Sequence, residues 1–103
     1  MATALSGSGP AYVFAFIESL IEAGVYMGMP REMATTLTVQ TVLGSAQLAK
    51  ETGDNPALLR ERVTSPGGTT AEALRELENH GFRSTILEAV AAAHRKARAL
   101  GGQ

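Results

Sequence analysis

Glycine and proline interrupt this chain at short intervals, and these breaks constrain its fold more than any other feature. They fall at residues 6–9, 28–30, 53–56 and 65–68 and at Gly81. Proline suits the first position of a helix, where its missing N–H costs nothing, and glycine suits the left-handed residue just past a helix end. The 103 residues therefore divide into helical segments joined by short connections.

Apolar periodicity predicts five helices, at residues 10–27, 30–52, 55–63, 70–79 and 82–100. The second is ambiguous, because residues 36–42 alternate and are rich in β-branched side chains, a composition that permits a strand. No turn residue separates this run from helix-favouring flanks, and Leu37, Thr41, Gly44 and Leu48 fall on one helical face. We therefore expect a single all-α domain over residues 1–103, without strands.

The first and last helices differ in their apolar faces. The first carries a broad apolar face that includes Val13, Phe14, Ile17 and Leu20, which predicts a helix nearly wrapped in protein. The last has a narrower stripe opposite charged residues, which predicts one face in water. Only 18% of the residues are charged, below the roughly 25% typical of soluble domains. Part of the apolar surface is therefore expected to meet a partner.

Charge and composition exclude several classes of protein. The formal net charge is −1 and the basic residues are scattered, so no nucleic-acid surface is expected. The most apolar run, residues 11–21, has no basic residue before it and is shorter than the roughly 20 residues of a membrane span. Neither a secretory signal nor a membrane helix is predicted. The absence of cysteine excludes disulfides and thiol chemistry.

The turn at residues 64–70, with the sequence TSPGGTT, is the best candidate for a binding site. Free N–H groups at a helix start, together with the helix dipole, attract an anion, and paired glycines let it approach the backbone. A plainer interpretation is a capping box, with Thr69 at the N-cap and Glu72 three residues later. The two interpretations are compatible, because Thr70 would still be free to contact a bound carboxylate or phosphate.

The other motifs are weaker candidates for a functional site. The Gly-rich start at residues 6–10 lacks the last glycine of a dinucleotide fingerprint, since Tyr12 holds that position, and no strand precedes it. His80 and His94 have no metal-ligating neighbours at suitable spacing, so no metal site is predicted. Carboxylates one helical turn apart are typical of solvated helix faces. No acid/base pair is predicted.

Six stretches in order resemble the C-terminal domain of pyrroline-5-carboxylate reductase: residues 4–12, 23–25, 28–31, 40–44, 63–70 and 81–83. The match covers nearly the whole chain, and residues 56–77 resemble the signature of that family. The resemblance implies a five-helix domain of the 6-phosphogluconate-dehydrogenase C-terminal-like type that forms an intertwined helical homodimer. Members of the family often assemble further, into decamers.

The resemblance also implies a reaction and a set of site residues. Family members reduce 1-pyrroline-5-carboxylate to L-proline with NADPH or NADH in the cytoplasm, and an N-terminal Rossmann domain holds the nucleotide. The active site lies between the Rossmann domain of one subunit and the helical domain of the other. Carried over by position, the backbone of Ser65, Gly67, Gly68, Thr69 and Thr70 would hold the substrate carboxylate. The Thr70 hydroxyl would hydrogen-bond the ring nitrogen and is the predicted catalytic group.

The 103 residues contain no Rossmann half, so we expect a domain fragment, natural or engineered, that binds no cofactor and has no reductase activity alone. It would retain weak affinity for a small carboxylate such as L-proline. Two alternatives stay open. One is a non-enzymatic helical oligomerisation module in which the turn is a plain cap, and the other is a regulatory proline sensor.

Overall fold

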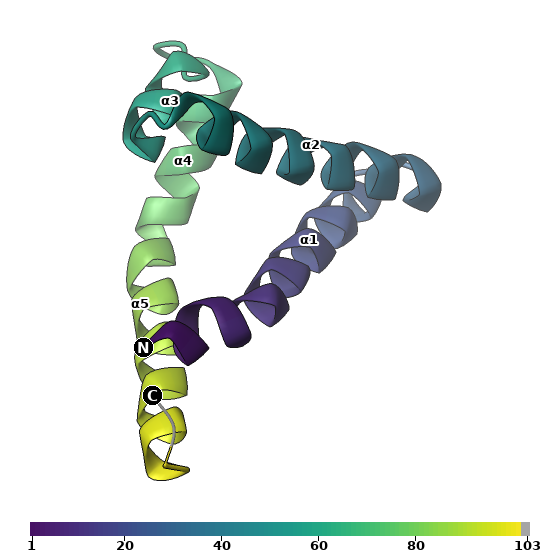
Figure 1. Ribbon diagram of the computed structural model, residues 1–103. Helices are drawn as coiled ribbons and strands as arrows, with labels where there is room; N and C mark the ends of the chain where they lie inside the picture. The colour runs from purple at the N-terminus through teal and green to yellow at the C-terminus, as the bar shows by residue number, and fades with distance from the viewer. Residues whose placement is uncertain (102–103) are drawn as a thin grey trace. The chain divides into compact units, whose positions relative to one another are not determined.

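The computed structural model describes residues 1–101, and the regular elements in this range are all helices. A short π-helix, η1 (Thr3–Gly7), precedes five α-helices, labelled in Figure 1. These are α1 (Gly9–Tyr26), α2 (Arg31–Thr52), α3 (Pro56–Arg62), α4 (Thr69–Asn79) and α5 (Phe82–Ala99). No strand occurs among the described residues, so the prediction of an all-α chain with five α-helices is confirmed.

Three glycines adopt the left-handed conformation at the helix ends where the sequence predicts it. The φ angles are +108° at Gly28, +67° at Gly53 and +75° at Gly81. Gly53 follows the last residue of α2 directly, and its N–H donates to the Ala49 carbonyl at 3.1 Å. Such a bond pairs a carbonyl that the end of a helix leaves without a partner.

The ambiguous run at residues 36–42 lies inside α2, so the choice of helix over strand is confirmed. Threonine hydroxyls along this helix bond to carbonyls one turn back. Thr35 donates to the Arg31 carbonyl at 2.8 Å and Thr41 to the Leu37 carbonyl at 2.7 Å. These bonds let β-branched polar residues lie within a helix without an unpaired hydroxyl.

The predicted loop at residues 6–9 is wrong, because η1 and the start of α1 cover this segment. Ser8 has helical angles and its N–H donates to the Thr3 carbonyl at 2.8 Å, the five-residue step of a π-helix. Ala4 of η1 is fully buried. Packing against α5 therefore outweighs the low helix propensity of glycine and serine.

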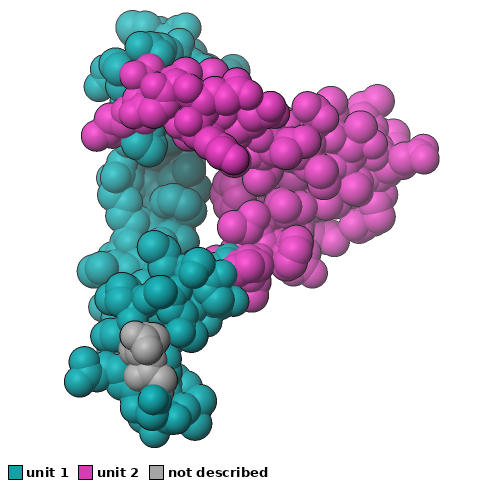
Figure 2. Space-filling model, viewed as in Figure 1, with its two compact units in different colours: residues 1–9, 56–103 teal, residues 10–55 magenta. Residues whose placement is uncertain are grey.

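The chain divides into two compact units, coloured separately in Figure 2. Unit 1 comprises residues 1–9 and 56–103, and in it η1 and α4 pack against α5. Its small core includes Ala4 and Ala97. Unit 2 comprises residues 10–55, which form the α1–α2 hairpin. In both units, the side chains that are buried are small.

Unit 2 is closely packed near the turn of its hairpin. A methyl group added at Gly24 of α1 would lie 3.2 Å from the Cβ atom of Ala34 in α2. Ala34 and Thr38 are the buried residues of α2, whereas Leu37 and Leu48 are exposed. Small residues therefore form the closely packed side of α2. Ala34 faces Gly24 because only a short side chain fits where α1 and α2 approach each other so closely.

The large apolar side chains of α1 lie at the surface of the chain. Phe14 is 67% exposed, and Val13, Phe16 and Leu20 are also exposed. The sequence predicts that protein surrounds this helix almost completely. Within a single chain the prediction is wrong, because these side chains are exposed. Exposed apolar surface of this extent is typical of an interaction site.

The stretch Thr3–Tyr26 is long and apolar enough to cross a membrane by length and composition. This segment combines η1 and α1, so it is longer than the apolar run at residues 11–21. The same test is passed by apolar helices that are covered by protein, so on its own it is weak evidence for a membrane span. Glu18 and Glu22 lie on the same segment.

Candidate functional site

The candidate binding site begins where α3 ends. The half-buried Thr64 side chain donates from Oγ1 to the Arg60 carbonyl at 2.6 Å, and the Thr64 N–H donates to the Glu61 carbonyl at 3.1 Å. Both bonds use carbonyls that the end of the helix leaves unpaired. Thr64 therefore fixes the direction in which the chain leaves α3.

Residues 65–68 then form a tight turn. The Gly68 N–H donates to the Ser65 carbonyl at 3.0 Å, Pro66 is the second residue, and Gly67 is the third with φ of +70°. Proline followed by a residue with positive φ is the pattern of a type II turn. The two glycines have different roles: Gly67 supplies the left-handed conformation, whereas a Cβ at Gly68 would lie 3.2 Å from the Ser65 oxygen.

The turn leads directly into α4, which begins one residue earlier than predicted. Gly68 is the N-cap residue, with extended backbone angles and no side-chain cap, and its carbonyl accepts from the Glu72 N–H at 3.2 Å. The predicted capping box is therefore wrong, because Thr69 already lies within the helix. The Glu72 carboxylate instead accepts from Arg75 Nη2 at 2.9 Å.

The start of α4 leaves backbone N–H groups free to bind a ligand. Glu72 is the first residue of α4 whose N–H bonds to a carbonyl four residues back, at Gly68, so the N–H groups of Thr69, Thr70 and Ala71 have no such partner. Thr69 is exposed and Thr70 is half-buried. Neither hydroxyl takes part in a cap. The dipole of the 11-residue helix adds positive potential at this end.

The predicted site residues Ser65, Gly67, Gly68, Thr69 and Thr70 thus lie together on one turn and the first residues of α4. The arrangement can accept a carboxylate or another small oxoanion through backbone N–H groups. The sequence places Thr64 in this turn but does not predict the role of its hydroxyl, which positions the turn. It also did not predict the left-handed conformation of Gly67, which the Pro66–Gly67 pair could have revealed as a type II turn.

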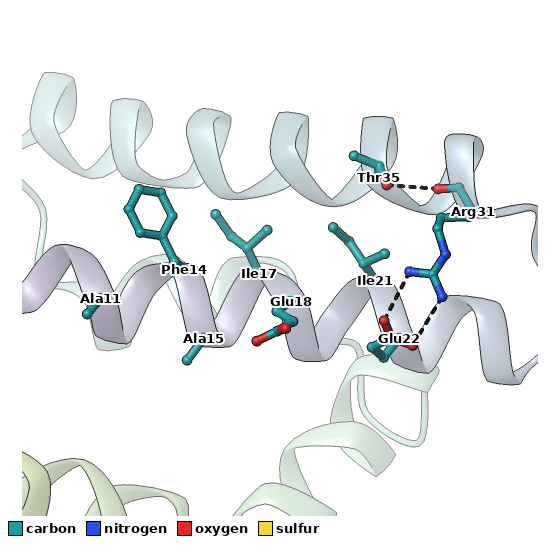
Figure 3. A pocket seen from close by; sticks show the side chains of 9 residues that line it. All are labelled: Ala11, Phe14, Ala15, Ile17, Glu18, Ile21, Glu22, Arg31 and Thr35. Atoms are coloured by element: carbon teal, nitrogen blue, oxygen red, sulfur yellow. Dashed lines mark hydrogen bonds and ion pairs between the residues drawn. The ribbon is translucent and has the colours of Figure 1, made fainter.

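A second candidate site, a groove of about 630 Å³, lies in unit 2 and is shown in Figure 3. Phe14, Ile17 and Ile21 of α1 contribute the large apolar side chains, and Thr35 of α2 lies above them. Glu18 and the pair Glu22–Arg31 provide its charges. This lining is suited to an apolar segment of protein rather than to a small polar substrate.

A bidentate ion pair closes the turn end of this groove. Arg31 donates from Nη1 and Nη2 to the two carboxylate oxygens of Glu22, at 3.0 and 3.3 Å. The hydrogen bonds and positive charge of Arg31 lower the pKa of Glu22 from its ordinary value of 4.5, and Glu22 raises the pKa of Arg31. Both side chains are exposed, so the pair contributes little to stability.

Neither histidine belongs to the turn or lines the groove. His80 Nδ1 is 2.9 Å from the Glu76 carbonyl, and His94 Nδ1 is buried without a hydrogen-bond partner. Within residues 1–101, no three side chains of the metal-ligating types gather into a cluster that could hold an ion.

Comparisons with known proteins identify the family. Residues 1–100 match the family described as pyrroline-5-carboxylate reductase dimerisation. The chain is 54% identical over 99 residues to the pyrroline-5-carboxylate reductase of Synechocystis, and this match covers 96% of the chain and 37% of the relative. It is 52% identical over 98 residues to the soybean (Glycine max) enzyme, covering 95% of the chain and 36% of the relative.

Solved structures agree with these matches. The pyrroline carboxylate reductase of Plasmodium falciparum, solved with NADP bound, superposes with a TM-score of 0.94 at 46% identity. This match covers 98% of the chain and 41% of that protein. The Coxiella burnetii pyrroline-5-carboxylate reductase gives a TM-score of 0.92 at 46% identity, covering 98% and 37% respectively.

The fold is therefore that of an all-helical domain found in pyrroline-5-carboxylate reductases. The chain belongs to the pyrroline-5-carboxylate reductase dimerisation family. It spans little more than a third of the length of the curated relatives that it matches.

Proposed function

We propose that this chain is the self-associating and substrate-carboxylate-binding part of a pyrroline-5-carboxylate reductase. In this proposal it forms a homodimer, and the reductase converts 1-pyrroline-5-carboxylate to L-proline with NADPH or NADH in the cytoplasm. The observation that carries the proposal is the family match over residues 1–100, supported by the exposed apolar side chains of α1. We further propose that the dimers assemble into a decamer. We also propose that residues 1–103 act as one domain.

The carboxylate cradle is proposed at Ser65, Gly67, Gly68, Thr69 and Thr70. Three unpaired N–H groups at the start of α4 and the left-handed Gly67 support it, because together they let an anion approach the backbone. Thr70 is proposed to hydrogen-bond the ring nitrogen of the substrate through its hydroxyl. Its half-buried position at the first turn of α4 is compatible with this role.

The described residues do not fit a nucleotide. A Rossmann site needs a strand before its glycines, and residues 1–101 contain no strand. The Gly-rich segment near the N-terminus is helical, and Gly9 is buried where a pyrophosphate would have to approach. We therefore predict that the 103-residue chain by itself binds no NADPH and reduces no substrate.

The cradle is tested by titrating L-proline into the ¹⁵N-labelled chain while the amide signals of Gly67, Gly68 and Thr70 are followed. Binding should shift these three signals together, with weak affinity, and Thr70→Val should reduce the shifts. Gly53, at the end of α2 in unit 2, serves as a reference signal that should not move. No shift at millimolar L-proline would contradict a cradle in the isolated chain.

The same titration separates the two alternatives. A non-enzymatic oligomerisation module predicts a dimer whose amide signals do not respond to L-proline. It is favoured by the same exposed apolar residues that support self-association. A regulatory proline sensor predicts tight binding by this chain alone, so saturation at micromolar L-proline would favour it.

A further inference from the structure

Unit 1 has a groove of its own, apart from the α1 groove of Figure 3. This α4 groove has a volume of about 390 Å³ and follows one side of α4, where residues 71, 74, 75 and 78 fall on one helical face. One arginine near the end of α3 and another at the start of α5 complete it. The lining residues are Arg60, Ala71, Leu74, Arg75, Glu78 and Arg83.

Two of the three arginines in the α4 groove already have a carboxylate partner. Arg75 donates from Nη2 to Glu72 at 2.9 Å, and Arg83 donates from Nε to Glu78 at 2.9 Å. The Arg60 guanidinium forms no hydrogen bond or ion pair with another residue in 1–101. The groove therefore has one uncompensated positive charge.

Arg60 also differs from the other arginines of residues 1–101 in its burial. It is half-buried, whereas each of the others is exposed. Withdrawing part of a charged side chain from water removes hydration that a partner normally replaces. The dipole of α3 does not account for this position, because Arg62 lies at the same end of the helix and is exposed. The Arg60 N–H groups are therefore available to an acceptor from outside the described residues.

The lining defines the class of acceptor. One uncompensated charge favours an anion with a single charge, and Glu78 in the same groove repels an anion of higher charge. A guanidinium matches the two oxygens of a carboxylate, and the apolar side chains of Ala71 and Leu74 suit a short aliphatic group.

From this lining we infer that the α4 groove binds a small aliphatic monocarboxylate, with Arg60 as the residue that holds the carboxylate. This site is separate from the proposed cradle at residues 65–70 and does not rest on the proposed function. Its ligand is recognised through a side-chain cation, whereas the cradle offers backbone N–H groups.

Three probes test the site on the unchanged chain. Butanoate has both a carboxylate and an aliphatic body, butan-1-ol lacks the charge, and inorganic phosphate lacks the aliphatic body. Butanoate should shift the Leu74 methyl signals and the Arg60 guanidinium signal with saturation at millimolar concentration. The other two probes should bind at least about fivefold more weakly, because each lacks one of the two interactions.

Substitutions test the role of Arg60. Arg60→Gln should weaken butanoate binding about tenfold, because it removes hydrogen bonds between two charged groups. Arg60→Lys should recover only part of the affinity, since an ammonium lacks the planar fork of a guanidinium. Arg62→Gln is the matched control: it removes the same charge from the same end of α3, does not line the groove, and should have little effect. Circular dichroism checks that each variant keeps its helices.

The possible outcomes separate this site from the proposed cradle. Equal binding of butanoate and butan-1-ol, or of butanoate and phosphate, would overturn the inference, and this comparison needs no variant to fold. An unchanged affinity in Arg60→Gln would overturn it as well. Shifts confined to the amides of Gly67, Gly68 and Thr70 would overturn the α4 site and leave the cradle standing. Shifts confined to Leu74 and Arg60 would support the α4 site and count against the cradle.

Discussion

The Ser65–Thr70 turn and the α1 groove differ in which residues determine their structure. The turn is specified by neighbouring residues: Pro66 and Gly67 set its backbone, and the bond from Thr64 to the Arg60 carbonyl fixes its approach. The α1 groove instead exposes Phe14 and its apolar neighbours, which residues of this chain do not cover. The turn is completed within one chain, whereas the groove is left open in this chain and is covered by a partner only in the proposed function.

The largest effect is expected from a charge placed in the groove. Phe14→Asp should weaken self-association by about 2–4 kcal/mol, because a central aromatic side chain in an interface is a typical hot spot. Sedimentation across a concentration series measures the change. Tyr26→Asp, at an exposed position that does not line the groove, is the control and should have a much smaller effect. Equal losses for both variants would contradict a localised interface.

A smaller effect is expected from backbone strain in the turn. Gly67→Ala should destabilise the fold by about 1–2 kcal/mol, because alanine is strained at a φ of +70° although no atom lies within 4 Å of the added methyl. Gly44→Ala, in the interior of α2 with open space around it in this chain, should instead stabilise by about 1 kcal/mol. Urea unfolding measures both. Identical effects of the two changes would show that Gly67 is not held in the left-handed conformation.

The contrast between the two regions explains which parts of the structure could be predicted from the sequence. The helices were predictable, because Gly28, Gly53 and Gly81 mark where they end and the apolar periodicity fills the segments between. The position of the candidate site was predictable for the same reason, since proline and glycine act on their immediate neighbours. Such local signals need no knowledge of the rest of the fold.

Features that depend on distant contacts were not predictable. The helical conformation of residues 6–9 depends on Ala4 packing against α5, which local propensity opposes. The closely packed side of α2 depends on where Gly24 meets Ala34, a contact that periodicity alone does not locate. The capping-box prediction was wrong for a local reason: the Gly68 carbonyl accepts the bond that starts α4, so the helix begins one residue earlier.

The Thr64 hydroxyl offers a more modest test of the turn. Thr64→Val keeps the shape of the side chain and removes its hydrogen bond to the Arg60 carbonyl, which should cost about 1 kcal/mol of folding stability. Thr69→Val is the matched control, since that hydroxyl is exposed and does not cap α4. Unfolding by urea measures both variants, and a loss for Thr69→Val as large as for Thr64→Val would contradict the proposed positioning role.

The smallest effect is expected from the exposed pair Glu22–Arg31. Arg31 lowers the pKa of Glu22 in the folded chain. The pair therefore stabilises the fold at pH values above the ordinary glutamate pKa of 4.5. This contribution is lost as the pH falls through the lowered pKa. Glu22→Gln should therefore slightly reduce stability at neutral pH and should match the parent chain in strong acid. Acid unfolding at low and high salt measures the difference, and a Glu22→Gln effect that persists in strong acid would exclude the ion pair as its source.

The mass of the chain in solution tests the central claim most directly. Multi-angle light scattering on the folded protein at micromolar concentration should give twice the chain mass of 10.8 kDa, or a larger even multiple. The helical content should be retained in the same sample. A fully helical, stable monomer of 10.8 kDa would show that the exposed face of α1 needs no second copy, and it would contradict this account.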